Sequence, residues 1–258
     1  MKIDPNPYRL KLAETEAELV AAQRLRYRVF VQELGAKIDP RSTFSKLERD
    51  RFDPFFDHLI LRDTRINDPM EAVVGVYRLL RSEVADQGIG YYGATEFDLS
   101  KIRQSGRSAV ELGRSCVAPE HRGGVALHML WHGLADYVLG HDIEIMFGTA
   151  SFPGCDAGQV RQALSFLHHH YLAPEDLRVP VHSSRAIQLD VLPFDKIDKL
   201  AALKQMPPLI KAYLRLGGFI GEGAFLDVNF NTIDVCLIVD MQRISQKYRT
   251  HYVRGQAV

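Results

Sequence analysis

The stretch 109–139, which contains "ELGRSCVAPEHRGGVALHMLW", limits the possible folds more than any other part of the chain. Its residues predict a strand over Ala109–Val117, a turn after Pro119 with two glycines, and a helix that stops at Gly140. A strand that leads through a tight turn into a helix is typical of α/β folds. The free backbone N–H groups at such a helix start favour a phosphate ligand.

The turn itself contains Arg122, Gly123 and Gly124. The turn is not a Walker loop, because no G-K-[ST] follows it, and it does not carry the G-x-G-x-x-G fingerprint of dinucleotide-binding proteins. Glycines let a phosphate approach the backbone, and Arg122 adds positive charge. From spacing alone, a phosphate cradle and an ordinary tight turn are equally good interpretations.

Strands and helices alternate along the rest of the chain. Thr15 with Glu18 forms a capping box, and Asp156 is a second N-cap. The alternation, with adjacent strands early in the chain, predicts a mixed α/β sheet in which the apolar run 232–240 is central. Helices are predicted over 15–35, 156–171 and 207–217, strands over 58–63, 71–81, 143–154, 186–192 and 232–240, and a loop over 86–93.

The composition fits a single globular domain. The chain has 258 residues, of which 46% are hydrophobic and 25% charged, and it contains no linker rich in Gly, Ser or Pro. We expect a core over about 8–155, a C-terminal elaboration over about 156–240 and a tail over 241–258. Lys+Arg and Asp+Glu both number 32, so the net charge gives no argument for a nucleic-acid partner.

The tail is locally basic, since residues 241–258 include Arg243, Lys247, Arg249 and Arg254 and no acid. It could face an acidic protein or an anionic membrane, or be a solvated terminus.

The 3 cysteines form no zinc-type pairs or disulfide framework, which indicates a reducing compartment. Without a signal peptide or a spanning segment, we expect a cytoplasmic protein, with possible peripheral contact with the inner membrane.

Val117, Pro119, Arg122, Gly123 and Gly124 resemble the V-x-P-x-x-R-G-x-G motif of the GNAT N-acyltransferase superfamily. The resemblance implies a GNAT fold, a mixed central β-sheet flanked by helices, with a C-terminal α/β extension. It also implies that the turn binds the phosphate and pantetheine of an acyl donor. The shorter glycine motif of the family begins here at His121 and reaches Gly124 and Ala126, which fits a carrier protein with one phosphate.

The blocks "LRYRVFVQELG", "ERDRFDPFFDHLI", "VVGVYRLL" and "ELGRSCV" are similar to those of acyl-homoserine-lactone synthases. The similarity implies acceptor-site roles for Arg26, Phe30, Glu48, Asp50, Asp53, Arg78, Glu111 and Arg114. "FGTASFPGCD", "ALSFLHHHYLAP" and the long block 207–240 instead resemble the ornithine lipid N-acyltransferases, often labelled hemolysin-like. This second resemblance runs from about Tyr8 to Asp240.

The ornithine lipid family implies transfer of a 3-hydroxyacyl chain from acyl carrier protein to the α-amine of ornithine, giving lyso-ornithine lipid. The resemblance also implies that no cofactor is tightly bound and that the acyl donor, acyl carrier protein, carries phosphopantetheine. A related group acylates glutamine. Apart from the turn, Cys116, Val117 and Ser151 are the implied donor contacts.

Attack on a thioester needs a neutral amine, so a base or a relaying water must accept a proton. Glu111 is our first candidate, with a structural partnership to Arg114 as the alternative. The two residues are three apart, so a bulge is needed for both to line one site. Arg78 and Arg114 could clamp the acceptor carboxylate.

The acids Glu48, Asp50 and Asp53 could receive an ammonium or be solvated loop charges. Glu48 is also a catalytic candidate, and Arg26 is equally well explained as an ion-pair partner of these acids. Tyr171 is a candidate general acid for the leaving thiolate. Cys116 fits a buried apolar residue better than a nucleophile, because no His–Asp pair is near in sequence.

Consecutive helical residues point about 100° apart, so we expect no metal at His168–His170.

Three other functions compete with an amino acid N-acyltransferase. They are a lactone synthase, a non-catalytic acyl-carrier or membrane-surface adaptor, and a literal hemolysin. The first would turn over S-adenosylmethionine, the second would tolerate Glu111→Gln, and the third lacks a lytic segment in the sequence.

Overall fold

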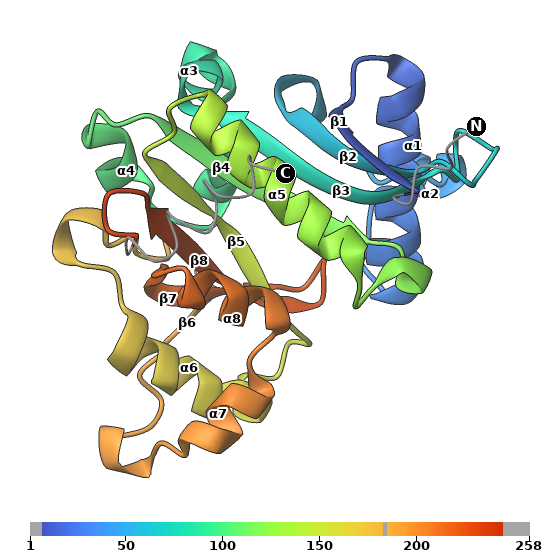
Figure 1. Cartoon of the computed structure of the whole chain (residues 1–258). Coiled ribbons are helices and arrows are strands. Elements are labelled where there is room, and N and C mark those ends of the chain that lie inside the picture. The colour runs from blue at the N-terminus through green and yellow to red at the C-terminus, as the bar shows by residue number, and fades with distance from the viewer. Residues whose placement is uncertain (1–6, 183–184, 245–258) are drawn as a thin grey trace. The chain divides into compact units, whose positions relative to one another are not determined.

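The computed structural model describes residues 7–182 and 185–244, drawn in colour in Figure 1. These residues form two compact units. Unit 1 combines Met1–Leu80 with Leu112–His141, and unit 2 combines Arg81–Glu111 with Asp142–Val258, as far as each is described. The division falls inside the strand 109–117. A single domain with a core over about 8–155 stays a prediction. Of the tail 241–258, residues 241–244 lie within the described part, and Arg243 is the basic residue among them.

Unit 1 contains the strands β1 (Tyr8–Leu12), β2 (Asp57–Asp63) and β3 (Val73–Arg81), followed in the sheet by β4 (Ala109–Val117). β2 pairs antiparallel with both β1 and β3, so that Leu59 lies opposite Leu12 on one side and Tyr77 on the other. The centre of β2 and nearly all of β3 are buried. Their apolar runs therefore form the core of the unit.

Helix α1 (Glu16–Arg26) begins where the sequence predicts, since the Thr15 side chain accepts a hydrogen bond from the backbone N–H of Glu18. It continues into a π-helical segment, η1 (Tyr27–Glu33), which the sequence did not predict. The helical segment ends before Gly35, whose φ of 76° is a left-handed conformation that glycine adopts without strain. Arg26 therefore lies where the helix changes its period.

Helix α5 (Val125–Gly140) lies across the strands of unit 1 (Figure 1). It approaches β1 closely at Gly133, where a Cβ atom would lie 2.2 Å from Cδ2 of Leu10. The Tyr137 hydroxyl donates to Asp57 at 2.5 Å, which ties the C-terminal half of α5 to β2. The remaining helical segments of the unit are short: α2 (Pro40–Ser45), η2 (Asp53–Phe55) and η5 (Pro119–His121).

Unit 2 contains the strands β5 (Ile145–Pro153), β8 (Thr232–Asp240), β7 (Phe219–Asp227) and β6 (Ala186–Ile187), in that spatial order. β8 pairs antiparallel with β5 and β7, which confirms the predicted central strand. The prediction of a strand over 186–192 is wrong beyond Ile187. The buried Ser165 hydroxyl accepts the N–H groups of Val191 and Leu192, so these groups do not join the sheet.

Helix α6 (Ala157–Tyr171) starts at Asp156, whose side chain accepts from the Gly158 N–H, as the sequence predicts. The predicted loop 86–93 instead contains short helical turns. The other helical segments of unit 2 are α3 (Ser82–Val84), η3 (Ala85–Ile89), η4 (Tyr92–Thr95), α4 (Ser100–Gln104), η6 (Glu175–Leu177), η7 (Phe194–Lys196), α7 (Lys199–Gln205) and α8 (Pro208–Arg215).

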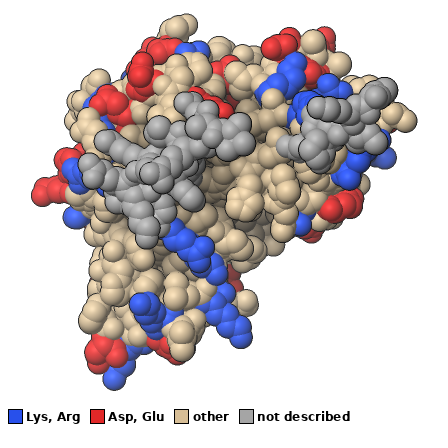
Figure 2. All heavy atoms as spheres, viewed as in Figure 1, with Lys and Arg blue, Asp and Glu red and all other residues tan. Residues whose placement is uncertain are grey.

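Among the described residues, no helix has the length and apolar character needed to cross a membrane. Basic and acidic side chains both appear on the face shown in Figure 2. This mixture agrees with the equal numbers of the two charge types in the sequence.

Candidate functional site

Six charged side chains that the sequence singles out form one network inside unit 1. At its centre, Arg26 donates from Nε to Oε2 of Glu48 at 2.5 Å and from Nη1 to Oδ1 of Asp53 at 2.7 Å. All three side chains are buried, and that of Arg26 is 0% exposed. The interpretation of Arg26 as an ion-pair partner of the acids therefore agrees with the structure.

Two further arginines complete the network. Nη1 of Arg78 lies 2.7 Å from Oδ1 of Asp53 and 2.8 Å from Oδ2 of Asp50. Nε of Arg114 lies 3.1 Å from Oε1 of Glu48, and its Nη2 lies 3.4 Å from Asp50. Three arginines thus face three carboxylates, and the network is electrically balanced. Arg78 and Arg114, the expected clamp for an acceptor carboxylate, here both contact Asp50.

The sequence did not identify two polar neighbours of this network. Gln23 donates from Nε2 to Asp53 at 2.9 Å, and a ring nitrogen of His58 lies 3.0 Å from the Asp53 carbonyl oxygen. Gln23 precedes Arg26 by three residues on one helix, a spacing that could have indicated it. His58 lies directly opposite Arg78 in the β2–β3 pair, which only the strand register reveals.

The network fixes the charge states of its members. Burial alone would raise the carboxyl pKa values, but Arg114 and Arg26 lower the pKa of Glu48 to about 2. Arg26 and Arg78 likewise lower the pKa of Asp53 to about 2 against the effect of its burial. A carboxylate with so low a pKa is a weak base. Glu48 therefore suits a positioning role better than the catalytic role that the sequence suggested.

The network reaches the surface at one end. The Asp50 side chain is 21% exposed and that of Arg114 is 11% exposed, whereas the other four are at most 3% exposed. Phe30 is half-buried in η1. An amino acid could reach this end with a cationic group toward Asp50 and its carboxylate toward Arg114.

Glu111, the first candidate for the base, lies in β4 where that strand belongs to unit 2. It is buried, and its two carboxylate oxygens accept the backbone N–H groups of Tyr92 at 2.8 Å and Gly93 at 2.5 Å. A Cβ atom on Gly93 would lie 3.0 Å from Oε1 of Glu111, so a larger residue would crowd this carboxylate. The turn η4 thus forms a cradle for the Glu111 side chain.

Within β4, Arg114 has a φ of 50°, which is uncommon for a residue other than glycine. A left-handed residue interrupts the alternation of side chains along a strand. The alternation of side chains along β4 is therefore interrupted at Arg114. That Glu111 and Arg114 line one site stays a prediction. The three residues from Gly113 to Ser115 are half-buried, while both ends of β4 are buried.

The glycine turn lies between η5 and α5 in unit 1. Gly123 has a φ of 78°, and Gly124 precedes the first residue of α5 without a side-chain cap. The N–H groups at the start of this 16-residue helix are therefore available to an anion. This geometry is compatible with the predicted phosphate site.

Two side chains of the turn are held by acids. Arg122 donates to both carboxylate oxygens of Glu33, at 2.5 and 2.7 Å, and to the Val117 carbonyl oxygen at 3.0 Å. A ring nitrogen of His121 lies 3.1 Å from Oδ2 of Asp63. The Arg122 charge is therefore shared with Glu33 in this conformation. Asp63 holds His121, the first residue of the shorter glycine motif, in place.

Comparisons with known proteins identify the family. A model of the acetyltransferase (GNAT) domain matches residues 25–132, which include the network and the glycine turn. The L-ornithine N(alpha)-acyltransferase of Rhodobacter capsulatus is 51% identical over 98% of this chain and 98% of that protein. The protein of the same name from Brucella abortus is 41% identical over 94% of this chain and 88% of its own length.

This chain belongs to the L-ornithine N(alpha)-acyltransferase family. It is therefore an acyltransferase with a GNAT fold, as the sequence predicted, and not a non-catalytic adaptor. Among solved structures, the CoA-dependent acyl-homoserine lactone synthase MesI is 14% identical, with a TM-score of 0.49 over 97% of this chain and 96% of that chain.

The remaining predicted residues of this acyltransferase have varied surroundings. Cys116 is buried, and burial raises the pKa of its thiol to about 12, which disfavours a nucleophilic thiolate. Val117 and Ala126 are buried in unit 1. In unit 2, Ser151 is exposed on β5, and Tyr171 ends α6 with its ring centroid 5.9 Å from that of Phe166.

Proposed function

We propose that this acyltransferase moves a 3-hydroxyacyl chain from acyl carrier protein to the α-amine of ornithine and releases lyso-ornithine lipid. The observation that carries the acceptor is the 51% identity, over 98% of both chains, to a protein named L-ornithine N(alpha)-acyltransferase. The rest of the proposal rests on the chemistry of the glycine turn and of the charged network.

The glycine turn supports a donor that carries phosphopantetheine. The start of α5 offers free N–H groups to one phosphate, and Gly123 leaves the backbone accessible. Just beyond the turn, Val125 and Leu127 are 57% and 42% exposed. Exposed apolar side chains beside a phosphate site fit a macromolecular donor, because a docked carrier protein would cover them. We therefore propose acyl carrier protein as the donor, with no tightly bound cofactor.

For the acceptor, we propose that ornithine contacts the exposed end of the network. Its carboxylate would face Arg114, and an ammonium group would face Asp50. The acceptor α-ammonium has an ordinary pKa of about 8, so it must lose one proton before it attacks. We propose Glu111 as the base, directly or through a water molecule.

The reaction then follows from the bonds that change. The neutral amine attacks the thioester carbonyl, and a C–N bond forms while the carbonyl oxygen becomes negative. The intermediate collapses with cleavage of the C–S bond, and the nitrogen loses its second proton. The thiolate of the carrier leaves and takes up a proton, so that the products are an amide and a free thiol.

A panel of donors and acceptors tests this function. The purified protein is incubated with 3-hydroxyacyl carrier protein or 3-hydroxyacyl-CoA, each with ornithine, glutamine or S-adenosylmethionine, and products are identified by mass spectrometry. We expect N-acylornithine with the carrier-protein donor. A product formed with glutamine but not with ornithine would overturn the proposal of ornithine as acceptor. Efficient use of the CoA donor would overturn the proposal of acyl carrier protein as donor. A lactone product would show that the protein is a lactone synthase.

We also propose peripheral contact with an anionic membrane, where an amphiphilic product could be released. In the short helix α2, Phe44 is 93% exposed, and Arg41 and Lys46 on either side are also exposed. An aromatic residue among basic ones suits an anionic bilayer surface. Cosedimentation with phosphatidylglycerol vesicles should fall in Phe44→Ser, whereas Phe55→Ser, a change at another exposed phenylalanine, is the control. Equal binding by both variants and the unchanged protein would contradict this contact.

A further inference from the structure

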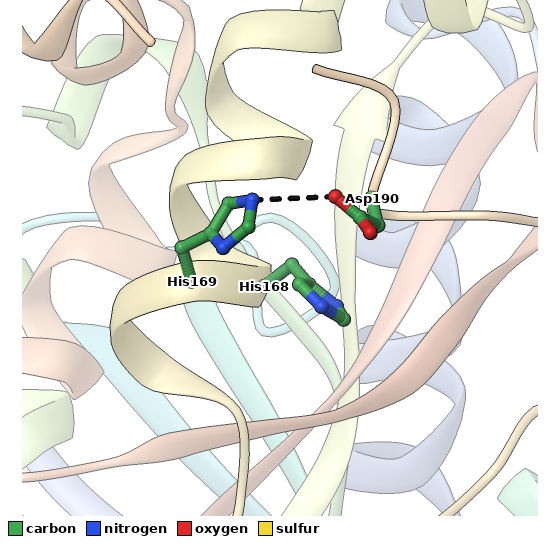
Figure 3. A group of neighbouring side chains, drawn as sticks. All are labelled: His168, His169 and Asp190. Carbon is green, nitrogen blue, oxygen red and sulfur yellow. Dashed lines mark ion pairs between the residues drawn. The ribbon is translucent and has the colours of Figure 1, made fainter. Parts of the chain in front are cut away.

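Two of the three consecutive histidines at the end of α6 lie close to an acid from a distant segment. Nitrogen atoms of His168 and His169 and a carboxylate oxygen of Asp190 all lie within 4.8 Å of one another (Figure 3). The third histidine, His170, packs its ring against Phe166, with centroids 4.5 Å apart. From the sequence we expected no metal at His168–His170, but the structure brings Asp190, rather than His170, beside the first two histidines.

The closest pair already has the spacing of two metal ligands. Nε2 of His169 lies 3.2 Å from Oδ1 of Asp190. Ligand atoms about 2.0–2.2 Å from a tetrahedral Zn²⁺ are roughly 3.3 Å apart. His168 is half-buried, and one of its ring nitrogens lies within 4.8 Å of the ligand atoms of both His169 and Asp190.

A buried serine holds the two sides of this group together. The side chain of Ser165, one turn before the histidines on α6, donates to the Leu189 carbonyl oxygen at 3.1 Å. It also accepts the N–H groups of Val191 at 3.2 Å and Leu192 at 2.9 Å. These three bonds fix the segment on both sides of Asp190 against the helix. The acid is thus positioned in advance next to the two imidazoles.

We propose that His168, His169 and Asp190 form a binding site for a divalent transition-metal ion of the Zn²⁺ type. Two imidazoles and one carboxylate are ligands that Zn²⁺ prefers, whereas Mg²⁺ and Ca²⁺ prefer oxygen atoms alone. Water would complete the coordination. The ion would link the end of α6 to the segment 189–192, and this link would stabilise unit 2. Metal binding is a property separate from the acyl transfer proposed above.

Zn²⁺ binding to the untagged full-length protein tests the site. Isothermal titration calorimetry should show one equivalent bound, and Co²⁺ should give the visible absorption of a tetrahedral ion. His168→Ala, His169→Ala and Asp190→Asn should each weaken Zn²⁺ binding at least about tenfold. Zn²⁺ should also raise the Tm of the unchanged protein, and this shift should be lost in the three variants.

His132→Ala is the matched control. His132 is an exposed histidine whose Nε2 lies 3.8 Å from Asp136, and among the described residues the pair has no third ligand of this kind. This variant should bind Zn²⁺ as the unchanged protein does. The proposal is overturned if no saturable binding is seen, or if His132→Ala weakens binding as much as the other variants. It is also overturned if His168→Ala binds normally, because the site would then have only two ligands.

Discussion

Two regions of the molecule hold buried carboxylates by different means. In unit 1, Glu48 and Asp53 face the guanidinium groups of Arg26 and of its neighbours. In unit 2, the backbone N–H groups of Tyr92 and Gly93 hold Glu111. Arginine side chains neutralise the acids that they bind, and they lower the pKa of those acids. Backbone N–H groups also stabilise the charged form of a carboxylate, but they orient it without placing a unit positive charge beside it.

The largest loss of stability should come from removing the central arginine of the network in unit 1. Arg26→Met leaves Glu48 and Asp53 buried without their central partner. Removal of one member of a buried ion network costs about 3–5 kcal/mol, because the remaining charges are not solvated. Urea unfolding followed by circular dichroism should show this loss in the free energy of unfolding.

Arg24→Met is the matched control, since Arg24 lies on the same helix and pairs with Glu71 at the surface, at 2.9 Å. Exposed ion pairs contribute at most about 1 kcal/mol. If both variants lose the same stability, the buried network does not hold unit 1 together.

Acid should weaken the same network by a somewhat smaller amount. Glu48 and Asp53 have folded-state pKa values of about 2, below the ordinary values of 4.5 and 3.8. Their contribution is therefore complete above about pH 5 and is lost as the pH falls toward 2. Between pH 7 and pH 3 the loss should be on the order of 3 kcal/mol for the two groups together. Urea unfolding at several pH values measures it, and a flat profile over this range would contradict the assigned ion pairs.

Glu111→Gln should instead affect activity more than stability. The amide keeps the shape of the side chain but cannot accept a proton from the acceptor amine. Loss of a general base lowers the rate by a factor of about 10² or more. The lost acceptor for one backbone N–H should cost roughly 1–3 kcal/mol of stability. Steady-state rates with saturating substrates, beside urea unfolding, separate the two effects.

Gly93→Ala is a useful companion to that variant. The added methyl group would lie 3.0 Å from Oε1 of Glu111 and would displace the carboxylate without removing it. We expect an intermediate loss of rate, smaller than that of Glu111→Gln. If Glu111→Gln keeps normal activity while Gly93→Ala loses it, the turn is important and the carboxylate is not the base.

The sequence predicted local structure better than it predicted partners across the chain. The strand Ala109–Val117 has the predicted limits, and Thr15 and Asp156 cap their helices as expected, because these signals depend on adjacent residues. The segment 189–192 was predicted as strand since its apolar residues fit one. The hydrogen bonds of Ser165, which lies more than twenty residues earlier, decide its structure.

The charged site shows the same limit. The six members of the network were found in the sequence through a family resemblance, but only the pairing of Arg26 with the acids was among the interpretations. His58 joins them only because β2 and β3 pair with this residue opposite Arg78. Arg26 is buried where α1 becomes a π-helix, and the spacing of residues on an ordinary helix does not predict that change.

The smallest effect concerns the glycine turn, where a surface arginine is held by an acid. If Arg122 contacts the donor phosphate, Arg122→Met should raise the KM for the acyl donor by roughly fivefold, equivalent to about 1 kcal/mol. Stability should change little, because the pair with Glu33 is exposed. Initial rates at varied donor concentration and low salt measure the effect.

Glu33→Gln separates the two roles of Arg122. It releases the guanidinium from its carboxylate partner, so its charge becomes fully available to the phosphate. The KM for the donor should then stay the same or fall, and added salt should remove the gain because exposed charges are screened. Equal increases in KM for Arg122→Met and Glu33→Gln would mean that the pair only braces the turn and that the backbone of α5 binds the phosphate alone.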